Sequence, residues 1–242
     1  MCLGAMDGKH ILLKKPANSG STFFNYKHTF SIVLLAVVDA DYRFLFVDVG
    51  CQGRISDGGV FRNSTLSSAL ETNELDIPPP HNIPNTDIIT PFVFVADDAF
   101  PLTNNIMKPY AHRGLNQTER IFNYRLSRAR RLSENAFGIL VSRFRVFRSG
   151  MEVQPEKAKV VVLAATVLHN FLMRHSTCHS SVQGLPTDMD ECRPALMHDS
   201  GQLRRIAPCL QKRPNVSAKA VQKKFALYFM SQGQVSWQWQ IN

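Results

Sequence analysis

The sequence predicts an α/β fold in which a mixed sheet is flanked by helices. Strand-length runs of apolar and β-branched residues open the chain, and another such run ends at Val95. After Glu119, apolar residues recur at three- and four-residue intervals, which is helical spacing. With 242 residues, of which 44% are hydrophobic and 19% charged, the chain is long and apolar enough for one sizeable core.

The first half of the chain predicts mainly strands. The second and third strands are close enough in sequence to form a hairpin, and a Pro-rich and Asn-rich stretch predicts an exposed connection before the fourth strand. In order, the predicted elements are strands at 2–14, 30–38 and 43–50, a helix at 60–70, the connection at 71–91 and a strand at 92–97.

The second half predicts helices. A short helical turn is expected at 104–108, a long helix from Glu119, and a last short helix at 217–230. The helix at 156–173 is expected to bury the side formed by Val160, Val161, Leu163, Ala164, Val167, Leu168 and Phe171. We therefore divide the chain into a domain at 1–174, a flexible linker at 175–216 and a C-terminal helix and tail at 217–242.

The charge balance favours a polyanionic partner. The formal charge is +9, the pI is about 9.5, and residues 120–148 contain eight arginines and one acid, Glu134. No apolar run approaches the roughly 18 residues of a membrane span, and no secretory signal opens the chain. Five cysteines without a CxxC pair fit a reducing compartment.

Three acids stand where a metal site is expected. Asp97 ends the strand at 92–97, Asp7 lies in a similar run near the N-terminus, and Glu134 lies in a helical segment. The order of strands and helices matches the ribonuclease-H-like fold, in which neighbouring strand ends converge. Mg²⁺ and Mn²⁺ prefer carboxylate oxygens, and two such ions serve both ends of a phosphodiester cleavage. Asp98 is the rival of Asp97, since adjacent strand residues point to opposite faces.

Each acid also has a structural interpretation. Asp7 precedes Gly8 and fits a turn, either Asp97 or Asp98 fits a helix cap, and Glu134 fits an arginine's ion-pair partner. Asp57 is a fourth acid, in a Gly-rich loop, and we favour a helix cap over metal ligation for it. The shared order of the three acids, next to a basic surface, favours the metal site.

Several motifs together resemble the catalytic domain of PIF/Harbinger-type transposases and the Harbinger-derived nuclease-like proteins. The resemblance covers roughly residues 3–173. Its motifs are Gly4-Ala5-Met6-Asp7-Gly8-Lys9-His10-Ile11, Phe23-Phe24-Asn25-Tyr26-Lys27, Ser56-Asp57-Gly58-Gly59-Val60-Phe61-Arg62-Asn63-Ser64, Ala96-Asp97-Asp98-Ala99-Phe100-Pro101-Leu102, Asn123-Tyr124-Arg125-Leu126-Ser127-Arg128-Ala129-Arg130, Glu134-Asn135-Ala136-Phe137-Gly138 and Leu168-His169-Asn170.

The resemblance implies a DDE endonuclease whose metal-binding acids are Asp7, Asp97 and Glu134. Two positions depart from the family pattern: Ala96 stands where Gly is usual, and Val141 where a basic residue is usual. The family's N-terminal helical DNA-recognition region is not in this sequence, so either the sequence is a truncated gene model or relic, or a partner protein, Myb-like in this family, supplies recognition. The resemblance also implies a protein of transposable-element origin located in the nucleus, with the cytoplasm as a second location. The residues expected to contact DNA are Lys9, Arg128, Arg130, Arg131, Arg143 and Arg145.

Two other functions remain open at this point. A catalytically inactive, domesticated or truncated relic would bind DNA or a protein through the same basic surface, without metal-dependent cleavage. A two-carboxylate hydrolase acting on sugars would work without metal, and the arginine-rich surface fits it poorly. The sequence also leaves the oligomeric state open, with a homo-oligomer among the alternatives.

Overall fold

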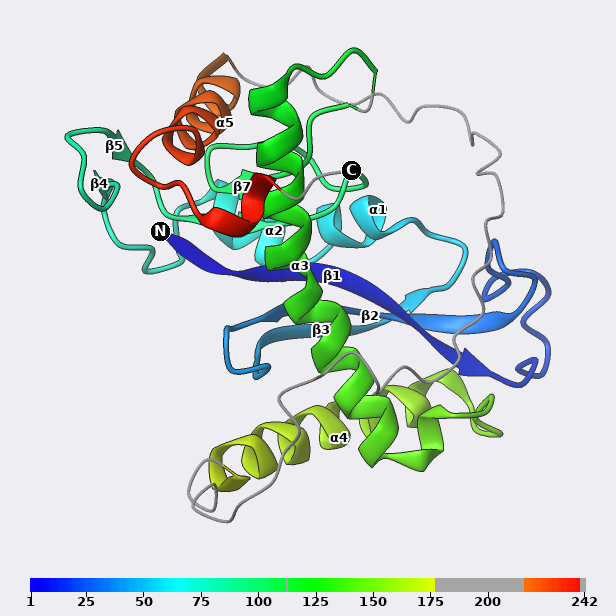
Figure 1. Cartoon of the computed structure of the whole chain (residues 1–242). Coiled ribbons are helices and arrows are strands. Elements are labelled where there is room, and N and C mark those ends of the chain that lie inside the picture. The colour runs from blue at the N-terminus through cyan, green and yellow to red at the C-terminus, as the bar shows by residue number, and fades with distance from the viewer. Residues whose placement is uncertain (112, 177–215, 240–242) are drawn as a thin grey trace.

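A five-stranded mixed sheet forms the centre of the computed structural model, which describes residues 1–111, 113–176 and 216–239 (Figure 1). In the order β3-β2-β1-β6-β7, its strands are β3 (Phe44–Gln52), β2 (Phe30–Val38), β1 (Cys2–Leu13), β6 (Val93–Val95) and β7 (Ile106–Met107). The first three strands are antiparallel neighbours, whereas β6 and β7 run parallel to β1. The predicted mixed sheet is confirmed, and its order is consistent with a ribonuclease-H-like fold.

Helices cover both faces of the sheet. Two short helices pack on one face with Phe94 and Phe100, and three others pack on the opposite face. The helices are α1 (Asp57–Arg62), α2 (Thr65–Glu71), α3 (Gln117–Arg143), α4 (Pro155–Ser176) and α5 (Val216–Phe229), with the 3₁₀ turns η1 (Arg145–Phe147) and η2 (Ser236–Trp239). Figure 1 shows α3 crossing the sheet between α5 and α4, which lie at opposite ends of the molecule.

The centre of the sheet is the part that hydrophobic patterning specifies best. Every β2 residue after Phe30 is buried, because helices cover both sides of this strand. The run of branched side chains from Ile32 to Val38 suits such a position. β2 pairs with β3 in antiparallel register, with Leu35 opposite Asp48, so the predicted hairpin is confirmed.

The long helix α3 begins with a capping box. The Asn116 side chain accepts the Glu119 backbone N–H, and the Glu119 carboxylate accepts the N–H of Asn116. Buried residues at helical spacing, including Phe122, Leu126 and Phe137, hold α3 against the sheet. These contacts fix the arginine-rich segment of the chain across one face of the sheet.

Two predictions about these segments are wrong. Residues 104–108 contain the strand β7, not a helical turn, because Phe94 and Ala96 of the neighbouring segment hydrogen-bond to Asn105 and Met107. A two-residue strand is too short to show a period in sequence. The helix expected at 60–70 is two helices, α1 and α2. The connection at 71–91 is mostly exposed, as predicted, and it contains a small ribbon of β4 (His81–Asn82) and β5 (Ile89–Thr90) around the buried Ile83.

The predicted inner side of α4 is wrong for most of its residues. Val161 and Leu163 are half-buried against the core, but Val160, Val167, Leu168 and Phe171 are exposed. Ala158, Val162, Ala165 and His169 are the residues that face the sheet. Asn170 fastens the helix to β3 through hydrogen bonds of 2.8 Å to both the N–H and the carbonyl of Phe44. Small residues allow α4 to lie close to the sheet, and periodicity alone cannot show which of two apolar faces is inward.

The C-terminal helix and turn pack on α3. The Arg125 guanidinium lies 4.4 Å from the Phe229 ring and 5.0 Å from that of Trp237, and it donates a hydrogen bond of 2.9 Å to Gln238. Residues 216–239 therefore share a core with α3 and β6. Nearly all of the linker predicted at 175–216 lies outside the described residues. Within those residues, no helix combines the length and apolar composition needed to cross a bilayer.

Replacing Gly58 with Ala should destabilise the fold by about 1–3 kcal/mol, because a Cβ atom there would lie 2.0 Å from the Ala99 carbonyl oxygen. This close approach holds α1 against the loop after β6. Urea denaturation measures the effect. Gly138, on the exposed side of α3, is the matched control: nothing lies within 4 Å of its added Cβ, so Gly138→Ala should stabilise by about 0.5–1 kcal/mol. Equal effects at both positions would contradict this account.

Candidate metal centre

The sheet register brings Asp7 and Asp97 together. Ala5 of β1 pairs with Val95 of the parallel strand β6, so the residues two positions later lie side by side. Within the described residues, one oxygen each from Asp7, Asp57 and Asp97 lies within 4.8 Å of the other two. Asp7 lies inside β1, so the interpretation of Asp7-Gly8 as a turn is wrong. Three carboxylates from two strand regions and a helix therefore form the acid cluster (Asp7, Asp57 and Asp97).

Asp57 enters this cluster from the start of α1. Ser56 is the N-cap residue of that helix and Asp57 its first helical residue, so the preferred interpretation of Asp57 as a helix cap is wrong. Its carboxylate lies against Gly8 instead, where an added Cβ would be 2.1 Å from Asp57 Oδ1. That oxygen is buried and has no hydrogen-bond partner in the described part of the chain. The absence of a side chain at Gly8 lets Asp57 reach the other acids.

Burial and mutual repulsion make the ionised form of these carboxylates less favourable. Burial raises the pKa of Asp7 to about 6, and the charges of Asp97 and Glu134 add to the rise, against a backbone hydrogen bond from Gly8 and the Arg130 charge. Burial, followed by the charges of Asp7 and Asp97, raises the pKa of Asp57 to about 6 as well. Crowded, partly buried carboxylates of this kind are stabilised by a cation.

Two residues of α3 reach the cluster. One Arg130 terminal nitrogen lies 3.9 Å from Asp97 Oδ2, while Arg130 Nε is buried without a partner among the described residues. The Ser133 hydroxyl is fully buried, 3.3 Å from Asp7 Oδ2 and 2.8 Å from the Arg130 carbonyl. Sequence reasoning missed Ser133. Its position three residues after Arg130, on the same side of the helix, was the available signal.

Glu134 occupies a different position from the one expected. Its side chain is exposed, and it is not one of the three acids whose oxygens lie within 4.8 Å of one another. Its charge nevertheless contributes to the raised pKa of Asp7, so the carboxylate lies near the cluster. No ion pair joins Glu134 to an arginine within the described residues. The structure thus brings Asp7 and Asp97 together and leaves Glu134 at the margin.

The neighbouring acid Asp98 points elsewhere. Asp98 Oδ1 pairs with Lys108 Nζ at 3.0 Å, and the carboxylate is largely exposed. Asp97 Oδ1 accepts the Ala99 N–H at 2.8 Å, which fixes the loop after β6, and no helix follows for either acid to cap. Of the two candidates, Asp97 is the one that joins the acid cluster.

The predicted DNA-contacting residues are spread over α3, η1 and β1. Arg130 lies beside the cluster, whereas Arg128 stacks 4.3 Å from the Trp237 ring and Arg131 is exposed. Arg143, at the other end of α3, and Arg145, in η1, are exposed about 20 Å from Arg130 along the helix. Lys9 is half-buried over the Phe137 ring at 5.8 Å, and burial lowers its pKa, while the Asp7 charge opposes that change. Of these residues, Arg130 and Lys9 interact with acids of the cluster.

The residues present fit a hard divalent cation. The cluster offers three carboxylates and no sulfur or imidazole ligand, which suits Mg²⁺ or Mn²⁺ better than Zn²⁺. The buried Asp57 oxygen without a partner is the kind of atom that a cation satisfies. The geometry therefore supports a metal site at the C-terminal end of β6.

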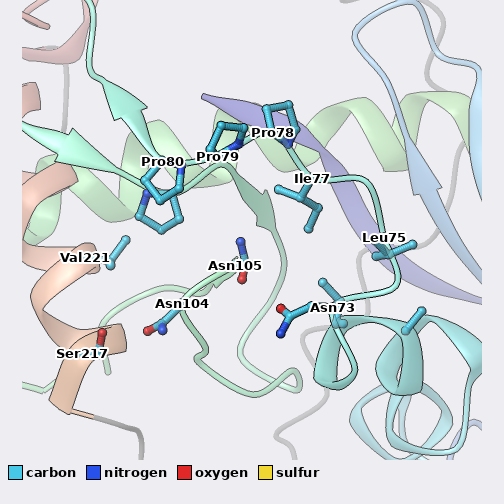
Figure 2. A pocket seen from close by; sticks show the side chains of 13 residues that line it. Asn73, Leu75, Ile77, Pro78, Pro79, Pro80, Asn104, Asn105, Ser217 and Val221 are labelled. Carbon is cyan, nitrogen blue, oxygen red and sulfur yellow. The ribbon is translucent and has the colours of Figure 1, made fainter.

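A pocket of about 450 Å³ lies apart from the acid cluster. Figure 2 shows it between the proline loop at 78–80, the two asparagines Asn104 and Asn105, and the start of α5 with Val221. None of its lining residues carries a carboxylate, an imidazole or a thiol. A sugar hydrolase needs two carboxylates in its binding site, so this pocket gives no support to that alternative.

Several known proteins are similar to this chain. Residues 6–170 match the family described as DDE superfamily endonuclease. The chain is 29% identical over 180 residues to Protein ALP1-like of Arabidopsis thaliana, covering 71% of this chain and 43% of that protein. It is 26% identical over 176 residues to the Homo sapiens protein named "Putative nuclease HARBI1", covering 72% and 46%.

A third relative extends the match towards the C-terminus. Antagonist of like heterochromatin protein 1 of Arabidopsis thaliana is 24% identical over 216 residues, which cover 88% of this chain and 51% of that protein. The chain thus spans about half the length of these relatives. No solved structure gives a significant match. On the extent of the family match, which includes every residue of the acid cluster, this chain belongs to the DDE superfamily endonucleases.

Proposed function

We propose that this protein is a divalent-metal-dependent DNA endonuclease of the transposase-derived type. The observation that carries the proposal is the meeting of Asp7, Asp57 and Asp97 oxygens within 4.8 Å. The register of β1 and β6 brings Asp7 and Asp97 together, and α1 supplies Asp57. Membership of the DDE superfamily endonucleases supports it. The positively charged arginines of α3 beside the cluster favour a phosphodiester substrate over an uncharged one.

Asp7, Asp57 and Asp97 would hold the metal ions. Bound Mg²⁺ or Mn²⁺, as a pair in the two-metal arrangement, would supply Lewis acidity at the attacking oxygen and at the oxygen that leaves the phosphorus. The protein's own part is to orient the carboxylates. The Gly8 N–H donates to Asp7 Oδ1 at 2.9 Å, and Ser133 lies beside its other oxygen, so both carboxylate oxygens are positioned.

Arg130 would balance charge within the site. Its guanidinium lies beside Asp97, and its charge opposes the rise in the pKa of Asp7. When cations neutralise the acids, the same guanidinium is free to contact a DNA phosphate, for which its bidentate donors are suited. Arg128 and Arg131 would then orient the DNA backbone next to it, and Arg143 and Arg145 would contact it further along α3.

Glu134 would complete the site when metal and DNA are bound. It lies on α3 one turn after Arg130, close enough to affect Asp7, so a change of side-chain conformation could bring its carboxylate to the cluster. Nuclear localisation and a Myb-like DNA-binding partner belong to the same proposal. The name of one relative, which refers to a heterochromatin protein, supports a nuclear setting.

The marginal position of Glu134 favours one alternative. If the third family acid never joins the cluster, the protein would be a non-catalytic descendant that binds DNA through α3. A supercoiled-plasmid assay distinguishes the two functions. The nuclease should nick the plasmid with Mn²⁺ or Mg²⁺ and stop when EDTA is added. Salt-sensitive binding without nicking at any metal concentration would instead establish the non-catalytic function.

A further inference from the structure

The turn between β1 and β2 exposes an aromatic side chain. Tyr26 is 63% exposed, whereas its neighbour Asn25 is 3% exposed. The Asn25 amide donates hydrogen bonds to Thr29 Oγ1 at 2.9 Å and to Ser31 Oγ at 2.8 Å. Its carbonyl oxygen accepts the backbone N–H groups of Lys27 and Thr29. Because these bonds fix the backbone on both sides of Tyr26, the exposed ring is held in place before any ligand binds.

His10 of β1 supports the Tyr26 ring from the side of the sheet. The two ring centroids lie 5.5 Å apart in an edge-to-face arrangement. His10 Nδ1 lies 2.9 Å from Ser31 Oγ, the same hydroxyl that accepts a hydrogen bond from Asn25. This network ties the turn to β1. An ordered tyrosine of this kind offers a large contact area to a flat ligand at a low cost in conformational entropy.

Positive charge surrounds the ring. Lys27 Nζ lies 5.6 Å from the centre of the Tyr26 ring. No ion pair joins Lys27 or Lys9 to an acid within the described residues. Burial lowers the pKa of His10, and the charges of Lys27 and Lys9 lower it further, so both ammonium groups lie near the imidazole. An aromatic ring beside two lysines suits a ligand with a flat face and a negative charge, which is the chemistry of a nucleotide.

The turn lies on the same open edge of the sheet as the acid cluster. From Lys9 to Ile11, β1 pairs with β2 on one side and, among the described residues, with no strand on the other. His10 follows Gly8, against which Asp57 lies, by two positions on the same face of β1, which is about 7 Å along the strand. That distance corresponds to about two nucleotides at 3.4 Å per nucleotide in one DNA strand.

We propose that Tyr26, His10 and Lys27 form a subsite that binds one unpaired nucleotide of DNA next to the acid cluster. The base stacks on the Tyr26 ring, and its phosphate lies against Lys27. In a fully paired duplex both faces of each base are covered by neighbouring bases, so the ring can stack only on a base that has left the duplex. The subsite rests on the proposed DNA endonuclease function, to which it adds a preference for unpaired DNA.

Fluorescence anisotropy in EDTA tests the subsite without cleavage, with the full chain and two labelled probes. The first probe is a fully paired duplex, and the second has a few unpaired thymines in one strand. The wild type should bind the second probe about 5- to 10-fold more tightly, at the lower end of what stacking of one base contributes. Tyr26→Ala should bind both probes equally, whereas Tyr26→Phe, which keeps the ring, should retain the preference.

Two further variants separate stacking from charge. Lys27→Ala should weaken binding to both probes and lower the slope of log K against log salt concentration by about one phosphate contact. Phe171→Ala is the matched control: Phe171 is similarly exposed, at 55%, but lies on α4, so this variant should bind both probes like the wild type. Circular dichroism checks that each variant is folded.

Photocrosslinking identifies the residue in contact with the unpaired base. With 5-iodouracil in place of an unpaired thymine, the crosslink should map to Tyr26. The subsite would be overturned by a crosslink to other residues alone, by equal binding of both probes by the wild type, by a preference that Tyr26→Ala retains, or by one that Tyr26→Phe loses. Plasmid nicking is scored separately. A protein with the preference but without nicking would keep the subsite and lose the nuclease, and nicking without the preference would remove the subsite alone.

Discussion

Asp97→Asn is expected to reduce metal-dependent DNA nicking by roughly 1,000-fold or more. Asp97 is the acid that joins strand β6 to the acid cluster, and an amide in its place withdraws one of three anionic ligands. Asn keeps the side-chain oxygen that accepts the Ala99 N–H, so the loop should keep its shape. Plasmid nicking with Mn²⁺ gives the rate, and fluorescence anisotropy with labelled duplex gives DNA affinity, which should fall less than 3-fold.

Asp98→Asn is the control for this change. The two acids are adjacent, but Asp98 is exposed and pairs with Lys108, so its loss should leave nicking within about 2-fold of the wild type. The comparison holds net charge and local sequence nearly constant. Equal loss in both variants would mean that general charge, and not the acid cluster, governs cleavage. Full activity in Asp97→Asn would remove Asp97 from the site.

Without metal, the ionised acid cluster should lower the free energy of unfolding at neutral pH. The pKa values of Asp7 and Asp57 are raised to about 6 in the folded protein, from 3.8. A group with a raised pKa stabilises the fold below its unfolded pKa, and that contribution is lost as the pH rises through the folded value. Between pH 4 and pH 7, with a chelator present, the pair should therefore lower the free energy of unfolding by roughly 2–4 kcal/mol.

Asp57→Asn isolates this contribution. The half-buried His10 and the buried His169 have pKa values lowered by burial and titrate in the opposite sense, so the wild-type profile alone is a sum of both effects. In EDTA at pH 7.5 the variant should be about 1–2 kcal/mol more stable than the wild type, and the difference should shrink as the pH falls and vanish below the unfolded pKa of 3.8. Urea denaturation at each pH provides the measurement.

Metal addition should reverse the order of stability. Millimolar Mn²⁺ at pH 7.5 should stabilise the wild type through preferential binding to the folded state, and Asp57→Asn by much less. At pH 4.5, where protons occupy Asp7 and Asp57, Mn²⁺ should have little effect on either protein. Wild-type stability that is independent of Mn²⁺ at neutral pH would contradict a metal site at these three residues.

Local pattern predicted the elements that position the site. The long apolar run at 30–38 can only be a buried strand, and the helical spacing after Glu119 can only bury one side, so β2 and α3 follow from composition and period. The strand assignments around Asp7 and Asp97 also follow from such runs. The proximity of Asp7 and Asp97 was predicted as well. That prediction came from the order of the elements and from a family resemblance, not from any local feature.

The sequence by itself thus determined the mixed sheet, the long basic helix and two of the acids. Only the tertiary structure decided that Asp57 joins the cluster over Gly8, that Ser133 and Arg130 face it, that Glu134 lies at its margin, and that α4 turns its small residues inward. The physical reason is the range of the interactions. Periodicity reports which residues share one side of a strand or helix, whereas the choice between two apolar sides, or between capping and ligation, depends on atoms supplied by distant segments.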